Sequence, residues 1–210
     1  MKGRNFAVAL VAAAAVGCAA VPSAGAANII EEWASVKPPA PPELKPVTLD
    51  PKTTALLMLD FLPPNCGVRP RCVATVPAMK VLLGEARAKG VTVMHTVFGN
   101  NEPGSILPDV APRPNEPWVK AFADKFLNTD LEKMLKEKGI QTVIVVGTAA
   151  NGAILYVGSG AALRGMKVVV PVDGISAVDP YAEQFTVWQL ANLPTFGTNV
   201  TITKSDMIKF

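Results

Sequence analysis

The chain alternates between short apolar runs and longer stretches in which apolar and charged residues mix. The apolar runs are between five and eight residues long, and they cover residues 54–60, 91–97, 141–147, 166–173 and 199–203. A continuous apolar run of this length is typical of a strand that is buried on both faces, as in a parallel sheet. The pattern therefore predicts five buried strands.

Between these runs, apolar residues recur at the spacing of a helix, or small apolar residues gather in longer segments. Thr129 or Asn128 is the candidate N-cap of one helix, and Glu132 has the spacing that completes a capping box with Thr129. The predicted helices cover residues 73–89, 129–139, 151–164 and 179–192. A loop rich in Pro, Gly and Asn is expected over residues 99–117.

Strands that alternate with helices imply a parallel sheet with helices on both faces. We therefore predict an α/β fold, a three-layer α/β/α Rossmann-like sandwich with a mostly parallel sheet, over residues 53–210. In such folds ligands bind outside the carboxyl ends of the strands. The residues that end the predicted strands are therefore the candidates for chemistry.

The first 26 residues have a different character. Lys2 and Arg4 precede an apolar run of about 11 residues, and Ala24-Gly25-Ala26 supplies the small residues of a cleavage site. This predicts a signal peptide over residues 1–26 and a secreted or periplasmic protein. The run is too short to span a bilayer, and no later run is longer, so we expect no membrane span. A lipoprotein site at Cys18 is the less favoured alternative, because Ala15 stands where a lipobox usually has Leu.

Residues 27–52 are predicted to form a proline-rich linker, with Lys37 to Pro42 in a semi-rigid polyproline conformation. Residues 29–33, which end in Trp33, are a candidate docking patch. The formal net charge is +3 for all 210 residues. Two of these charges belong to the predicted signal peptide, and the near-neutral remainder argues against a nucleic-acid partner.

Two cysteines follow the predicted signal peptide. Cys66 and Cys72 flank a segment that contains Gly67 and Pro70, which suits a tight loop. An exported protein meets an oxidising compartment, so a possible disulfide stands beside the alternative of two unpaired thiols.

Several polar residues lie where the predicted strands end. Asp60 ends the first strand, His95 and Thr96 lie near the end of the second, and Asp173 ends a later one. Thr148 begins the turn after the strand 141–147. An acid at the end of a buried strand indicates a functional site, whereas Asp173 is interpreted as a structural cap and His95 as a residue of the core or of the pocket lining.

The order of these motifs resembles the isochorismatase-like cysteine hydrolase superfamily. The resemblance covers about residues 53–204 and rests on the strand-ending Asp60, on Trp118-Val119-Lys120 nine residues before Thr129-Asp130-Leu131, on Gly147-Thr148-Ala149-Ala150-Asn151, and on the strand that ends in Asp173. It implies an enzyme in which a Cys attacks a carbonyl carbon, an Asp takes the proton of the thiol and a Lys lowers its pKa. Backbone N–H groups at the turn hold the developing oxyanion.

Carried onto this chain, the resemblance assigns Asp60 and Lys120 as catalytic residues and Thr148, Asn151, Gly152 and Ala153 as substrate-binding residues. The position of the nucleophile falls on Ala153, which cannot form a thioester. Cys66 is a poor replacement, because many relatives have a nonreactive Cys at that place.

Three functions stay open on this basis. The chain acts on or binds a small amide, imide or related compound by a noncovalent or altered mechanism; it is a catalytically inactive binding protein; or it is a structural or partner-binding module that uses the N-terminal tether. The resemblance also implies a homo-oligomer. No cofactor is expected, because no G-x-G-x-x-G motif occurs, and no metal, because His95 is the single histidine.

Overall fold

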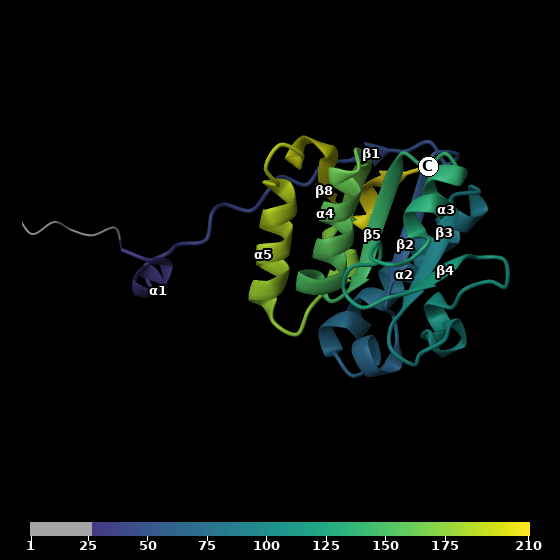
Figure 1. Cartoon of the computed structure of the whole chain (residues 1–210), viewed down its shortest axis with the longest axis horizontal. Coiled ribbons are helices and arrows are strands. Elements are labelled where there is room, and N and C mark those ends of the chain that lie inside the picture. The colour runs from purple at the N-terminus through teal and green to yellow at the C-terminus, as the bar shows by residue number, and fades with distance from the viewer. Residues whose placement is uncertain (1–26) are drawn as a thin grey trace, which may run out of the picture. The chain divides into compact units, whose positions relative to one another are not determined.

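A parallel sheet of seven strands lies at the centre of the folded domain (Figure 1). The computed structural model describes residues 27–210, so the predicted signal peptide and Cys18 lie outside the described residues. The strand order is β4-β3-β2-β5-β6-β8, with β7 alongside β5, and every pair is parallel. The strands are β2 (Thr54–Leu59), β3 (Thr92–Val97), β4 (Trp118–Lys120), β5 (Thr142–Thr148), β6 (Lys167–Pro171), β7 (Ile175–Ser176) and β8 (Val200–Thr203).

Helices cover both faces of this sheet. The helices are α2 (Pro70–Ala88), α3 (Leu131–Glu137), α4 (Leu155–Leu163) and α5 (Pro180–Ala191). Helix α2 packs on one face, and α3, α4 and α5 supply the core of the other. The predicted three-layer α/β/α fold with a mostly parallel sheet is confirmed.

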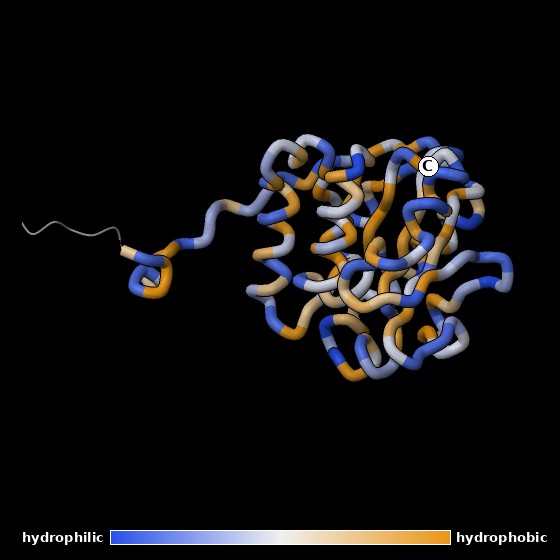
Figure 2. The backbone as a smooth tube through the Cα atoms, in the orientation of Figure 1, coloured by the Kyte–Doolittle hydropathy of each residue, from blue (hydrophilic) through white to orange (hydrophobic). Residues whose placement is uncertain are grey.

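Strand β2 shows why the sheet is buried on both faces. Ala55, Leu57 and Leu59 belong to the core on the side of α3 and α4, whereas Leu56 and Met58 belong to the core beneath α2. This is the alternation that a strand's period of two requires. In Figure 2 the apolar segments accordingly gather in the central strands.

Shorter elements connect the main ones. Two are π-helical, η1 (Pro63–Gly67) and η4 (Ala150–Ile154). Five are 3₁₀ turns: η2 (Pro103–Ser105), η3 (Pro108–Val110), η5 (Val172–Gly174), η6 (Gly197–Asn199) and η7 (Ser205–Met207). A second sheet joins β1 (Val47–Thr48) to β9 (Ile208–Lys209).

The structure differs from the predicted boundaries in three places. Strand β1 and the buried Leu49 lie inside the predicted linker 27–52, and the domain extends from Pro41 to Phe210. Strand β4 was not predicted, because three residues carry too little pattern. Helix α2 begins at Pro70 rather than at residue 73, since proline suits the first turn of a helix.

The predicted capping box of Thr129 and Glu132 is wrong. Thr129 accepts a hydrogen bond from the N–H of Leu131 (3.2 Å) and donates to the carbonyl of Lys125 (2.5 Å). Glu132 pairs with Arg164 and Lys136, which lower its pKa to about 2. The side chain of Glu132 therefore stabilises the surface of α3 rather than its start.

The described residues before Pro41 form a separate unit with one short helix, α1 (Ile29–Glu32). Asn28 caps it by accepting hydrogen bonds from the N–H groups of Ile30 and Glu31. Ile30 and Trp33 are 74% and 63% exposed, so this unit presents apolar side chains to solvent.

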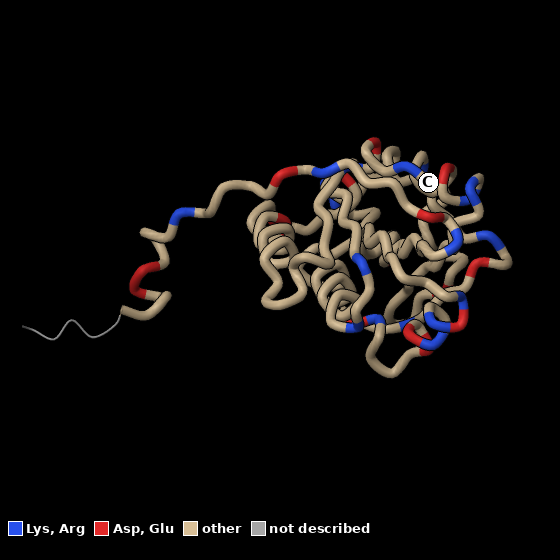
Figure 3. The backbone as a smooth tube through the Cα atoms, turned by 90° about the horizontal axis from the view of Figure 1, so that it is seen from above, with Lys and Arg blue, Asp and Glu red and all other residues tan. Residues whose placement is uncertain are grey.

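Two further observations concern hydrophobicity and charge in the described residues. Across residues 27–210, helices long and apolar enough to cross a bilayer are absent. Basic and acidic positions are interspersed in the view of Figure 3.

Candidate functional site

The site lies where the central strands β3, β2 and β5 end. Leu59, the last residue of β2, is in register with Thr96 on one side and with Gly147 on the other. Asp60 therefore emerges between Thr96 and Thr148, at the carboxyl edge of the sheet. This is the edge at which folds of this kind bind ligands.

The backbone turns sharply at Asp60, which has a φ of 55°. Residues other than glycine rarely adopt this left-handed conformation, although Asp tolerates it better than most. The Thr96 hydroxyl accepts a hydrogen bond from the Asp60 N–H (3.2 Å) and donates one to Asp60 Oδ1 (2.6 Å). One threonine thus holds both the strained backbone and the carboxylate, which is only 4% exposed.

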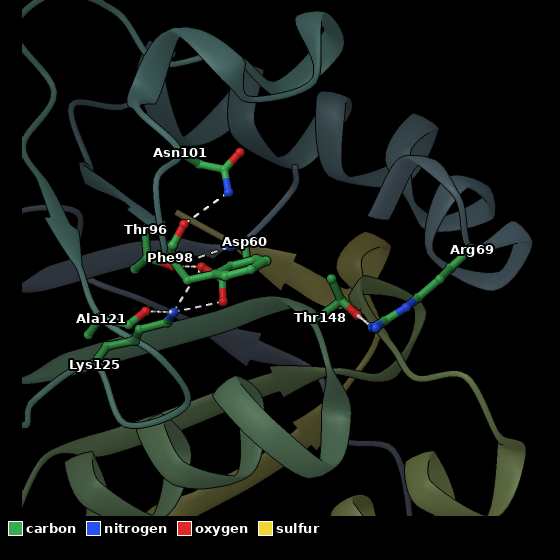
Figure 4. A network of polar contacts seen from close by, with 8 residues as sticks. All are labelled: Asp60, Arg69, Thr96, Phe98, Asn101, Ala121, Lys125 and Thr148. Atoms are coloured by element: carbon green, nitrogen blue, oxygen red, sulfur yellow. Dashed lines mark hydrogen bonds and ion pairs between the residues drawn. The ribbon is translucent and has the colours of Figure 1, made fainter. Parts of the chain in front are cut away.

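The lysine beside Asp60 is Lys125, not Lys120 (Figure 4). Lys125 Nζ donates to Asp60 Oδ1 (2.9 Å), to Asp60 Oδ2 (2.7 Å) and to the carbonyl of Ala121 (2.8 Å). An ammonium group has three N–H donors, so all of them are satisfied. The Lys125 side chain is completely buried.

Lys120, the lysine selected from the sequence, points away from Asp60. In β4 only Val119 faces the core, so the neighbouring Trp118 and Lys120 face outward. The ammonium of Lys120 pairs with Glu102 at the surface. Lys125 could not be predicted as a site residue, because nothing in the local pattern of the sequence marks a lysine as buried.

The segment after β4 brings Lys125 into place. The Asp124 carboxylate accepts a hydrogen bond from the Phe126 N–H (2.9 Å), and the Thr129 hydroxyl donates to the Lys125 carbonyl (2.5 Å). Asn128 adopts a left-handed φ of 55°. These local bonds fold the segment into a tight loop that directs the ammonium inward.

Burial dominates the protonation of this pair. It raises the pKa of the Asp60 carboxyl, against the opposing effect of Lys125. It lowers the pKa of the Lys125 ammonium, against the opposing effect of Asp60. Because its pKa is raised, Asp60 takes up a proton more readily than an exposed carboxylate does.

The turn after β5 carries the other residues selected from the sequence. Ala153 lies in η4 and is 3% exposed, Gly152 is half-buried and Asn151 is exposed. The Gly152 N–H donates to the carbonyl of Ala149 (2.9 Å) and therefore stabilises the turn itself. The peptide bond between Thr148 and Ala149 is cis.

Thr148 is buried and its hydroxyl donates to the carbonyl of Ser176 (3.2 Å). The same hydroxyl is 3.5 Å from a guanidinium nitrogen of Arg69, a residue that the sequence analysis did not select (Figure 4). Arg69 precedes α2, so its side chain reaches the site from the side of the disulfide loop.

Cys66 and Cys72 form that disulfide, with both side chains buried. The thiol alternative left open by the sequence therefore does not hold in this structure. A disulfide sulfur cannot act as a thiolate nucleophile.

His95 and Asp173 take structural positions. His95 Nε2 is 2.9 Å from Glu116 Oε2, and Arg87 donates to both oxygens of Glu116. Burial lowers the pKa of His95, against the opposing effect of Glu116. Asp173 accepts hydrogen bonds from the backbone and the hydroxyl of Ser205. Both residues link elements outside the Asp60 site.

The lowered pKa of His95 predicts that the stability of the protein depends on pH. Its pKa in the folded protein lies below the ordinary value of about 6.5. Below about pH 6.5 His95 therefore binds a proton more readily in the unfolded chain than in the folded protein, and lowering the pH favours unfolding. We expect urea unfolding to give a free energy that falls between pH 7.5 and pH 5.5 in the native protein.

The variant His95→Gln is the control for this prediction, because Gln keeps a donor for Glu116 but does not titrate. The difference in stability between the two proteins should change across the same pH range. A constant difference would show that His95 does not govern the slope.

Metal ligands are not grouped in the described part of the chain. Across residues 27–210, three or more His, Cys, Asp or Glu side chains do not converge anywhere at distances that would hold an ion.

Comparison with known protein families gives one match that covers most of the domain. The model of the isochorismatase domain matches residues 54–204, more than two thirds of the chain. This range begins at β2, ends beyond β8 and includes Asp60, Lys125 and Ala153.

Two curated proteins resemble parts of the chain. Streptothricin hydrolase from Streptomyces noursei is 32% identical over 110 residues, which are 47% of this chain and 43% of that protein. A nicotinamidase from Acinetobacter baylyi is 33% identical over 67 residues, which are 32% of this chain and 31% of that protein. The chain thus spans less than half the length of each of these relatives.

Solved structures share the fold at low sequence identity. A cysteine hydrolase from Pseudomonas syringae pv. phaseolicola has a TM-score of 0.69 at 20% identity and covers 79% of this chain and 94% of its own. The nicotinamidase of Staphylococcus aureus has a TM-score of 0.65 at 16% identity and covers 73% and 99%. These similarities extend over nearly the whole of the neighbouring chains.

Proposed function

The chain belongs to the isochorismatase family, and on that premise we propose that it binds a small amide, imide or related carbonyl compound at Asp60 without forming a covalent intermediate. The family is one of hydrolases, and the proposed ligand class is supported by a relative named as a nicotinamidase and by a structural neighbour named as an N-carbamoylsarcosine amidase. The binding residues would be Asp60, held by Thr96 and Lys125, and the turn that carries Ala153.

One observation carries this proposal: the acid–lysine pair is complete, whereas Ala153 occupies the position that the family resemblance assigns to the nucleophile. Asp60 and Lys125 are buried and joined by two hydrogen bonds. A buried ion pair contributes little net stability compared with apolar residues of the same volume, so its presence at a strand end favours a functional role. Ala153 offers only a methyl group, and Cys66 and Cys72 are joined to each other.

A second candidate function is noncovalent hydrolysis. It is favoured by the raised pKa of the Asp60 carboxyl, since a carboxyl that gains and loses protons closer to neutral pH is suited to acid–base catalysis. In this scheme the Asp60 carboxylate takes a proton from the water molecule whose oxygen attacks the carbonyl carbon, and it returns that proton to the leaving nitrogen as the carbon–nitrogen bond breaks. The two candidates share the binding step and differ in turnover.

Both are tested by measuring binding and product release with the purified protein. The ligands are a panel of small amides and vinyl ethers, and binding is followed by ligand-observed NMR. We expect binding that weakens at least about tenfold in Asp60→Asn, which is about 1.4 kcal/mol, and no change in protein mass. Asp109→Asn is the matched control, because Asp109 pairs with Lys80 at the surface.

Turnover that is lost in Asp60→Asn would favour noncovalent hydrolysis over binding alone. A covalent adduct with the native chain would contradict the absence of a nucleophile. Equal binding by the native protein and by Asp60→Asn would place the ligand elsewhere and refute both candidates.

We also propose that the protein is exported. The support is the signal-peptide pattern of residues 1–26 and the disulfide between Cys66 and Cys72, since disulfides persist in oxidising compartments. Fractionation of expressing cells, with processing followed by the mass of the mature chain, tests this. A protein that stays uncleaved in the cytosol would contradict it.

Self-association is proposed as well. Tyr181, Phe185 and Trp188 lie on one stripe of α5 and are 61%, 37% and 39% exposed, and exposed apolar stripes of this kind mark interaction surfaces. Because apolar residues near Trp33 are exposed, we also predict that the segment before the domain binds a partner. Light scattering measures the molecular mass of the full chain and of a chain without residues 27–40. The comparison separates self-association through α5 from self-association through the segment near Trp33.

A further inference from the structure

Arg69 carries a positive charge at the candidate site that nothing in the described residues neutralises. Its guanidinium approaches Thr148 Oγ1 at 3.5 Å, a long contact that leaves most of its N–H donors unused. Among residues 27–210, Arg69 forms no ion pair, whereas the neighbouring Arg71 pairs with Glu183, which also accepts the N–H of Ala177 (2.9 Å). The side chain is partly buried, so water screens this charge less than at an open surface.

The neighbouring groups make the edge attractive to an anion. Asp60 and Lys125 cancel each other's charge, so the net charge of the three residues is that of Arg69. Leu59 and Gly147 are paired in register, and Asp60 and Thr148 follow them directly in the chain. Thr148, which Arg69 contacts, therefore lies next to Asp60 at the edge of the sheet. An anion bound by Arg69 would thus lie close to the Asp60 site.

A buried hydroxyl without a partner supports the same conclusion. Ser176 is 1% exposed, and within the described chain its Oγ makes no hydrogen bond. Ser176 pairs in register with Thr148, so its side chain points to the same face of the sheet. Unpaired buried hydroxyls are costly, and an anionic ligand next to Thr148 would accept this one.

The disulfide holds Arg69 in position. Arg69 lies between Cys66 and Cys72; its N–H donates to the carbonyl of Cys66 (2.9 Å), and its own carbonyl accepts from the N–H of Cys72 (2.9 Å). These two bonds attach Cys66 and Cys72, the ends of the disulfide loop, to the backbone of Arg69. A fixed backbone beneath the guanidinium reduces the conformational entropy that binding would otherwise lose.

We propose that Arg69 binds a carboxylate of the ligand, so that the ligand class of this site is a small amide or related carbonyl compound that also carries a carboxylate. Guanidinium groups suit carboxylates because two parallel N–H donors match the two oxygens. The inference rests on the proposed function, since it places the carboxylate next to a carbonyl group bound at Asp60. Arg69 is a binding residue in this scheme, and Cys66 and Cys72 are positioning residues.

A pair of alkylating reagents tests this without knowledge of the natural ligand. Iodoacetate and iodoacetamide have nearly the same shape and differ in charge. In the full-chain variant Ala153→Cys the introduced thiolate attacks the CH₂ carbon of either reagent, a sulfur–carbon bond forms and iodide leaves. Peptide mass spectrometry measures the rate at position 153 and separates it from Cys18.

We expect Arg69→Gln, added to this variant, to lower the rate with iodoacetate about tenfold relative to the rate with iodoacetamide, the equivalent of about 1.4 kcal/mol. Arg113→Gln is the matched control, since the Arg113 side chain is exposed and the charge change is the same. Replacing Cys66 and Cys72 by Ser should lower the ratio in the same direction. An unchanged ratio in Arg69→Gln would overturn the proposal.

The same experiment separates this inference from the proposed function. If the introduced thiol reacts with both reagents no faster than a free cysteine and is unaffected by Asp60→Asn, the proposed function fails. If Asp60→Asn changes both rates but Arg69→Gln leaves their ratio unchanged, only the Arg69 inference fails. Should Ala153→Cys not fold, the affinities of the otherwise native protein for succinamate and succinamide, compared with Arg69→Gln, give the second measurement. Preference for succinamate that Arg69→Gln does not reduce would again overturn the inference.

Discussion

Replacing Lys125 by methionine is expected to lower the free energy of unfolding by about 3–5 kcal/mol, the usual cost of removing one partner of a buried ion pair. Methionine has a similar length but no charge, so the Asp60 carboxylate would stay buried with Thr96 as its remaining side-chain donor. Natural domains have a free energy of unfolding of about 5–15 kcal/mol, so the expected loss is a large fraction of the total stability. Urea unfolding followed by tryptophan fluorescence measures it.

Lys120→Met is the matched control. Lys120 makes an ion pair with Glu102, but its side chain is 36% exposed, and surface pairs contribute at most about 1 kcal/mol. The double variant Asp60→Asn with Lys125→Met should be more stable than Lys125→Met alone, because it leaves no unpaired charge. Destabilisation by Lys125→Met should also decrease at acidic pH, where the carboxyl becomes protonated. Equal effects of the two lysine variants would contradict the assignment of Lys125.

The fold could be predicted because its signals are local. A run such as residues 54–60 is apolar on both faces, and that pattern has few interpretations other than a central parallel strand. Strand β4 was missed for the opposite reason, since only Val119 faces the core. Had that single inward residue been recognised, alternation would have placed Lys120 at the surface.

The site was predicted in part, and the missing part depends on tertiary structure. Asp60 could be found because it ends an apolar strand. Lys125 could not, because its burial depends on the hydrogen bonds that it donates to the Ala121 carbonyl and to Asp60, 65 residues away in sequence. Arg69 was missed similarly, since its contact with Thr148 joins residues that are 79 positions apart.

Replacing Gly147 by alanine is expected to destabilise the protein by more than about 4 kcal/mol, beyond the range of most single substitutions. A Cβ atom at this position would lie 1.9 Å from the carbonyl oxygen of Leu59, and the φ of +125° is unfavourable for any residue with a side chain. Leu59 belongs to β2, which is held between β3 and β5, so its backbone cannot move away without breaking the central sheet. We expect a large loss of stability in urea unfolding or a failure to fold.

Gly84→Ala is the control, because it makes the same chemical change in a different setting. Gly84 lies on the exposed side of α2, and a Cβ atom there would meet no neighbour within 4 Å. Alanine in a helix should raise the stability by about 0.5–1 kcal/mol. A Gly147→Ala protein as stable as the native one would mean that β2 and β5 do not approach this closely. In that case Asp60 and Thr148, which follow Leu59 and Gly147 directly, would not lie side by side, and the site described above would lose its geometric basis.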